Sequence, residues 1–173
     1  MPRVNMVLKR DSSGQIKKVF GTNGQNGKSA EGLYRTLAHS PLTLKNLMKL
    51  ESDLSHKAKL PPKLRELIIL RISILAGSRY EWNQHQSIAL NAGATQEQID
   101  TIHEWPESKH FDSQEKAVLR YVDQVTLNIR ATDRTFRMLR KYFNDRTIIE
   151  LTATIGFWGM IVRLVEPLEI QSD

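Results

Sequence analysis

The sequence predicts an all-α protein, a compact multi-helix bundle preceded by an N-terminal hairpin or extended arm. Three observations indicate helices: apolar residues recur at three- and four-residue steps, prolines and capping residues stand where helices begin, and no strand pattern is evident after Ser29. A chain of 173 residues is long enough to bury about 70% of its unfolded surface. We therefore expect a basic, Gly-rich arm over residues 1–29 and one helical domain over residues 30–173.

The arm has no helical period. Two short segments, Val4–Lys9 and Gln15–Phe20, flank Asp11-Ser-Ser-Gly14, an arrangement that favours a β-hairpin. The following Gly21–Gly27 stretch has the composition of a flexible linker and lacks the spacing of a phosphate-binding loop.

The net charge of +6 is concentrated near the start of the chain. Residues 1–60 hold 11 Lys or Arg against 4 Asp or Glu, whereas residues 61–173 hold 14 against 15. A basic arm can bind nucleic acid or an acidic partner. Here the basic residues are dispersed, so the pattern favours a solvated surface over nucleic-acid binding.

The first half of the domain is predicted to be helical. Pro41 suits the first turn of a helix. Pro61-Pro62 opens the next, which is apolar on nearly all sides, should be central, and should end near Gly77. The periodic leucines before it are Leu33, Leu37, Leu44, Leu47, Leu50 and Leu54.

The second half continues the helical pattern. A helix is expected from about Tyr80 to Asn91, followed by a turn at Ala92-Gly93-Ala94. Thr95 with Gln98 three residues later has the form of a capping box. Two more helices are expected to begin near Ser113 and near Asp133. Asp145 is expected to cap the last helix, which is long and apolar.

Composition excludes several classes of protein. The chain has no cysteine, which excludes disulfides, zinc-thiolate sites, iron–sulfur clusters and thiol nucleophiles. The apolar segment Leu151–Val162 spans 12 residues before Arg163, fewer than the roughly 20 that a membrane helix needs. No secretory signal pattern is evident at the start. We expect a cytoplasmic protein with no membrane partner.

Two acidic residues, Glu66 and Glu81, and one histidine, His85, are the candidates for chemistry. Glu66 lies in the most apolar helix, where a carboxylate needs a partner. Glu81 and His85 are four residues apart, hence on one helical face. If the helices on either side of Gly77 pack antiparallel, Glu66 and His85 are offset by roughly 4–5 Å along the axes, so a direct contact or a one-water bridge is feasible.

This arrangement resembles the carboxymuconolactone decarboxylase and alkylhydroperoxidase D superfamily, whose peroxidase branch has the pattern Glu-x11-Cys-x2-Cys-x3-His. Glu66 and His85 match the pattern, while Ser78 and Glu81 occupy the two cysteine positions. Other segments within about residues 30–170 also resemble the decarboxylase branch. They are Leu60-Pro-Pro-Lys-Leu-Arg-Glu66, Tyr80-Glu-Trp82, Gly93 and Gly156-Phe157-Trp158. The chain therefore resembles the cysteine-free, decarboxylase-type branch.

The resemblance implies an alkylhydroperoxidase D-like fold and an enzyme without organic cofactor or metal, acting on a small carboxylated or lactone substrate as a carbon–carbon lyase. The lack of cysteine excludes the thiol peroxidase chemistry of the other branch. His85 would be the acid or base, Glu66 would orient it and Glu81 would share its proton network. The candidate substrate-binding residues are Tyr80, Arg79, Arg71, Ser78 and Trp82. The family also implies a homo-oligomer, a trimer or a hexamer.

Other interpretations remain open at this stage. The Glu–His pair could satisfy two buried polar groups without catalysing anything, and isomerisation, dehydration or lactone hydrolysis would use the same groups. A non-catalytic oligomer that binds a partner through the basic N-terminal third is a further alternative. Glu107 and His110 have the spacing of a metal-binding pair but no second copy, so no metal site is expected.

Overall fold

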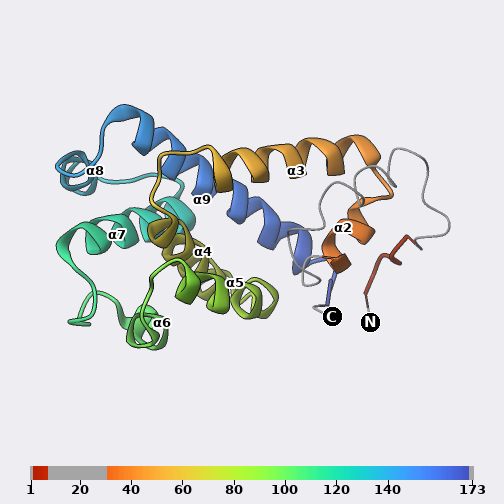
Figure 1. Cartoon of the computed structure of the whole chain (residues 1–173), viewed down its shortest axis with the longest axis horizontal. Coiled ribbons are helices and arrows are strands. Elements are labelled where there is room, and N and C mark those ends of the chain that lie inside the picture. Colours follow the sequence, from red (N-terminus) through yellow and green to blue (C-terminus); the bar gives the residue numbers. More distant parts are fainter. Residues whose placement is uncertain (1, 8–30, 172–173) are drawn as a thin grey trace.

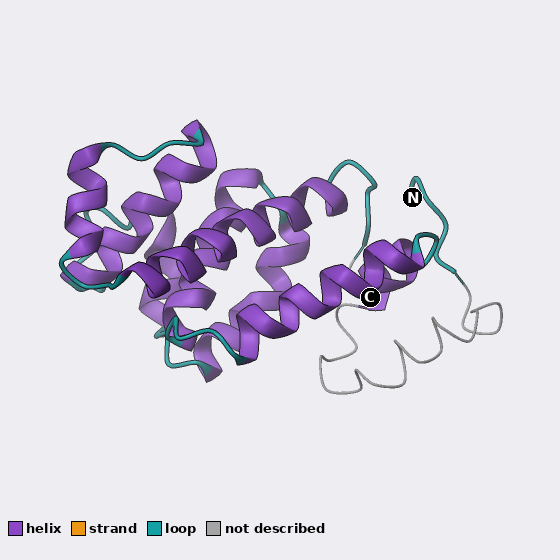
Figure 2. Ribbon diagram, turned by 90° about the horizontal axis from the view of Figure 1, so that it is seen from above, coloured by secondary structure: helices purple, strands orange, loops and turns teal. Residues whose placement is uncertain are grey.

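The computed structural model describes residues 2–7 and 31–171. Within these residues every regular element is a helix and no strand is present, as Figure 2 shows. The elements are α2 (Glu31–Leu37), α3 (Pro41–His56), α4 (Pro62–Ala76), α5 (Arg79–Asn91), α6 (Gln96–Thr101), the 3₁₀ turn η3 (Ile102–Glu104), α7 (Ser113–Asn128), α8 (Asp133–Arg140) and α9 (Asp145–Val165). The predicted all-α class is confirmed.

Helix α4 is the centre of the bundle. It packs against α5, α7 and α9 (Figure 1), and nine of its residues are buried. It begins at Pro62, which needs no backbone N–H partner in the first turn. It ends at Gly77, whose left-handed backbone (φ 67°) is the conformation that glycine adopts without strain. Both ends agree with the sequence-based prediction. Because α4 ends sharply at Gly77, the chain reverses and α5 packs against α4.

The helix caps were predicted with mixed success. Thr95 and Gln98 form the expected capping box of α6. Helix α7 begins at Ser113 as expected, and its cap is Asp112, because Asp112 and Glu115 reciprocally bond each other's backbone N–H groups. The cap of α9 is Asn144, one residue before the predicted Asp145. In both cases the side chain immediately before the helix reaches the N–H of the third helical residue.

Helix α9 is longer than its apolar segment suggested. It has 21 residues and is long and apolar enough, by length and composition alone, to cross a membrane. More than half of its most apolar stretch is buried inside the protein, where it packs on α3, α4 and α7. Such burial is what the core helix of a globular bundle requires.

The described part of the arm lies along the end of the bundle. The Arg3 N–H donates to the Leu168 carbonyl at 3.0 Å, and the Val7 N–H donates to the Arg35 carbonyl at 3.1 Å. Residues 4–7 are not a strand. The rest of the predicted hairpin and the Gly21–Gly27 linker lie outside the described residues.

Candidate active site

Glu66 is the buried carboxylate at the start of the site, with 2% of its side chain exposed. One carboxylate oxygen accepts the Arg65 Nε–H at 3.0 Å, and the other lies 2.7 Å from His85 Nδ1. Arg65 also donates to the Ser55 carbonyl at 2.8 Å, which ties the start of α4 to the end of α3. Both Glu66 oxygens therefore have partners, as burial of a carboxylate demands.

His85 of α5 lies between two carboxylates. Its Nδ1 is bonded to Glu66, and its Nε2 lies 3.5 Å from Glu81 Oε2, across one turn of the same helix. The Trp158 ring of α9 meets the imidazole edge to face, with centroids 6.0 Å apart. The bond to Glu66 fixes Nδ1 as the donor and leaves Nε2 as the nitrogen for proton exchange.

The pKa values of His85 and Glu81 are both raised, for different physical reasons. Burial lowers the pKa of His85, but the hydrogen bond and charge of Glu66 outweigh it, with help from Glu81 and Glu51, and the pKa lies above its ordinary value. Burial raises the pKa of Glu81 to about 7, against the opposing charge of His85. A carboxyl that titrates near neutrality beside an imidazole is suited to acid–base chemistry.

Glu51 of α3 was not among the predicted site residues. This half-buried carboxylate accepts the Tyr34 hydroxyl proton at 2.7 Å. Burial raises its pKa, while the charge of His85 lowers it. The signal was present: Leu47 and Leu54 are buried, and Glu51 sits between them at helical spacing, whereas Leu50, which was assigned to the apolar face, is 46% exposed.

Three of the predicted substrate-binding residues have structural tasks. Ser78 caps α5, its hydroxyl accepting the Glu81 N–H at 3.4 Å. Trp82 packs partly buried against the core. Arg71 forms two bonds to Asp123, at 2.6 and 3.0 Å, and two more to the Ile102 and His103 carbonyls. With its donors so engaged, the structure offers no support for a substrate carboxylate at Arg71.

Arg79 and Tyr80 do line a pocket. Its volume is about 530 Å³, and its walls are Gly77, Arg79, Tyr80, Glu166, Ile170 and Gln171. Arg79 is exposed and Tyr80 is buried, and the two immediately precede Glu81 in α5. Glu166 is the link between this pocket and the acidic cluster of Glu51, Glu66, Glu81 and His85, because its charge raises the pKa of Glu81.

Among residues 2–7 and 31–171, no group of three or more His, Asp or Glu side chains is arranged to hold a metal ion. Glu107 and His110 therefore do not belong to such a group.

Comparison with known proteins places these residues in a wider context. A model of the carboxymuconolactone decarboxylase family matches residues 41–124, the segment that contains Glu51, Glu66, Glu81 and His85. The uncharacterized protein YdfG of Bacillus subtilis is 26% identical over 119 residues, which are 68% of this chain and 80% of that protein.

Solved structures share the fold. A protein of unknown function from Agrobacterium tumefaciens, described as a candidate antioxidant defence protein AhpD, is 29% identical with a TM-score of 0.75, over 79% of this chain and 94% of that one. The debrominase Bmp8, in complex with 2,3,4-tribromopyrrole as a cysteine-to-alanine variant, has a TM-score of 0.82 at 20% identity, over 97% and 90% of the two chains. That second likeness concerns the fold alone.

Proposed function

The chain belongs to the carboxymuconolactone decarboxylase family, in its cysteine-free branch, and on that premise we propose that it is a cofactor-independent acid–base enzyme in which His85 exchanges a proton with a small substrate. The observation that carries the proposal is the 2.7 Å hydrogen bond between His85 Nδ1 and Glu66. A carboxylate that orients an imidazole from its far nitrogen is a recurrent arrangement in acid–base catalysis.

The proton route follows from the two ring nitrogens. Glu66 holds Nδ1–H, so the proton that moves is the one on Nε2, beside Glu81. With a pKa of about 7, Glu81 is close to half protonated at neutral pH and can exchange a proton with Nε2. In a decarboxylation the electron pair left by carbon dioxide passes into a carbonyl or conjugated system, and His85 then protonates the carbon.

The pocket at Arg79 and Tyr80 is the proposed place for the substrate. An exposed guanidinium can bind a carboxylate of the substrate. Neither Glu81 nor His85 lines this pocket, so the reacting end would have to extend toward them from the wall at Tyr80. Because that cluster is rich in carboxylates, we expect a neutral group there, such as a lactone or carbonyl.

The test is turnover of small carboxylated lactones by His85→Asn. Asn keeps approximate size and hydrogen bonding but cannot transfer the proton, so kcat/KM should fall by about 10² to 10⁴ while the protein stays folded. His103→Asn is the matched control, because that histidine is 60% exposed. Full activity of His85→Asn, or no turnover of these compounds by the wild type, would contradict the proposal.

We also propose that the protein is a homo-oligomer, a trimer or a hexamer. Large apolar side chains are exposed on α9 and at the end of α7, including Ile149 (67%) and Ile129 (76%). Exposed apolar groups of this kind are typical of interfaces. Light scattering should return about 60 or 120 kDa for three or six copies of the 19.9 kDa chain, and a mass near 20 kDa would refute the assembly.

A further inference from the structure

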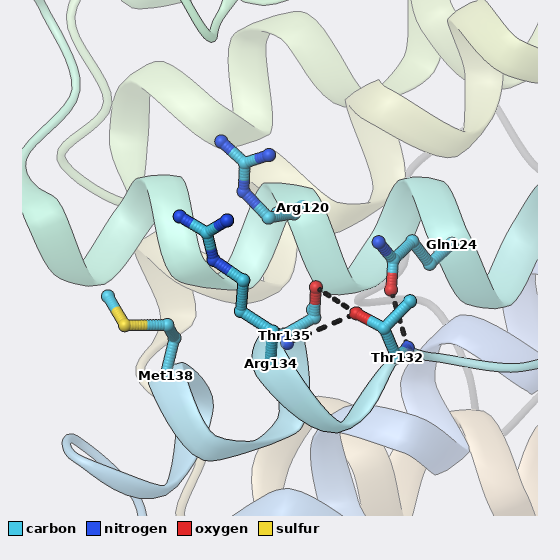
Figure 3. A pocket seen from close by; sticks show the side chains of 6 residues that line it. All are labelled: Arg120, Gln124, Thr132, Arg134, Thr135 and Met138. Carbon is cyan, nitrogen blue, oxygen red and sulfur yellow. Dashed lines mark hydrogen bonds between the residues drawn. The ribbon is translucent and has the colours of Figure 1, made fainter.

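A second pocket is lined by residues of α7 and α8 and of the turn between them. These two helices, labelled in Figure 1, carry none of the residues of the acidic cluster. Its volume is about 410 Å³. The lining residues, drawn in Figure 3, are Arg120, Gln124, Thr132, Arg134, Thr135 and Met138. None of the six is acidic.

Two arginines from different helices share this pocket. Both Arg120 and Arg134 line the pocket, and in Figure 3 their side chains extend in the same direction. In the described part of the chain neither forms an ion pair with a carboxylate. The Arg120 guanidinium lies over the Trp105 ring, 5.3 Å from its centroid, which restrains it. The nearby Asp123 is held by Arg71 and by the Trp105 N–H.

The neutral side chains of the pocket present donors as well. The Gln124 carboxamide oxygen accepts the Thr132 N–H at 2.8 Å, which orients the amide nitrogen as the free donor. The Thr132 hydroxyl accepts the Thr135 N–H and donates to the Thr135 hydroxyl. Thr135 is 2% exposed, and its own hydroxyl proton has no acceptor among the described residues.

The charge around the pocket has one sign. Residues 129–141 contain five Arg or Lys and a single acidic residue, Asp133, which does not line the pocket. Two guanidinium groups that line one pocket repel each other, and an anion bound between them removes this repulsion. Guanidinium groups bind phosphate oxygens in pairs of parallel hydrogen bonds.

We propose that the pocket between α7 and α8 binds a small organic phosphate, whose doubly charged oxyanion lies between Arg120 and Arg134. The amide nitrogen of Gln124 supplies a further donor. Met138, 37% exposed, gives one wall an apolar surface for the organic part of the ligand.

Binding of phenyl phosphate to the full chain at low salt tests the proposal, with inorganic phosphate, benzoate and phenol for comparison. Titration calorimetry should give saturable binding of phenyl phosphate that is tighter than that of the other three. Arg120→Ala and Arg134→Ala should each weaken it about tenfold or more, the effect expected for a lost charged hydrogen bond. Arg137→Ala is the matched control, an exposed arginine of α8 outside the pocket, and should change the affinity less than about twofold.

Several results would overturn the proposal. An equal loss in all three variants would mean diffuse attraction by surface charge. Inorganic phosphate binding as tightly as phenyl phosphate would mean that the site takes the free ion, and tighter binding of benzoate would make it a carboxylate site. Absence of saturable phenyl phosphate binding would end the proposal. None of these outcomes depends on the role of His85.

Discussion

Two buried ionic side chains lie on α4, Glu66 near its start and Arg71 about one and a half turns later, and their surroundings differ. Arg71 faces one carboxylate, Asp123, and two carbonyls, which together match its donors. Glu66 faces Arg65 and His85, in a cluster that holds two further carboxylates, Glu51 and Glu81. Charge is balanced at Arg71 and in excess at Glu66. A balanced pair holds helices together, while an unbalanced cluster has groups that titrate near neutral pH.

The largest expected effect comes from breaking the balanced pair. Arg71→Met removes the cationic partner of Asp123, which keeps only the Trp105 N–H, and the donor to two carbonyls, so the free energy of unfolding should fall by about 3–5 kcal/mol. Urea denaturation measures it, with Arg137→Met, an exposed arginine, expected to stay within about 0.5 kcal/mol of the wild type. A loss below about 1 kcal/mol for Arg71→Met would remove the distinction between the two regions.

Protonating the acidic cluster should have the opposite effect and raise the free energy of unfolding. The pKa of Glu81 is about 7 in the folded protein against an ordinary 4.5, so its stabilising contribution is present below pH 4.5 and lost as pH rises through about 7. His85, whose pKa is also raised, acts in the same direction. The wild type should therefore lose up to about 3 kcal/mol of stability between pH 5 and pH 8.

Glu81→Gln removes the charge that causes this loss. At pH 8 the variant should be more stable than the wild type, by an amount on the order of 3 kcal/mol at most, and at pH 5 the difference should be small. Denaturation curves at both pH values measure it. A variant that is destabilised equally at both would show that the Glu81 charge is fully compensated, as that of Asp123 is.

The pKa of His85 distinguishes the region around Glu66 from the region around Arg71, and its measurement needs no substrate. In Glu66→Gln the hydrogen bond to a charged carboxylate is lost while burial remains, so the pKa of His85 should fall. Asp123→Asn, in the other region, should leave it unchanged. Histidine ring nitrogen shifts in NMR report the value, and an unchanged titration in Glu66→Gln would contradict the coupling.

The smallest expected effect lies outside both regions. Gly156 is an exposed residue within α9, and a Cβ built there meets nothing within 4 Å. Gly156→Ala should stabilise the fold by about 0.5–1 kcal/mol through helix propensity. Thermal unfolding measures this gain in stability. It gives the size of effect to expect from a substitution that involves no ionic partner. Destabilisation would show that another surface covers this face of α9.

Individual residues show how far the sequence allowed prediction. The breakpoints at Pro62 and Gly77 were predictable because proline and glycine impose their own backbone conformations. The cap of α9 was predicted at Asp145 but is Asn144, since the two neighbouring residues have similar capping chemistry. Glu51 was overlooked because Leu50 fits the same helical stripe, and only packing decides which of the two faces inward.

By itself the sequence determined everything that depends on neighbours along the chain: the helices, the shared face of Glu81 and His85, and, through the lack of cysteine, the absence of thiol chemistry. Tertiary structure decided which faces meet. It brought Glu66 into contact with His85 and added Glu51 to the cluster, and it joined Arg71 to Asp123. The reason is that helical periodicity sets the direction of a side chain around its own axis, whereas its partners depend on how separate helices are oriented in the packed core.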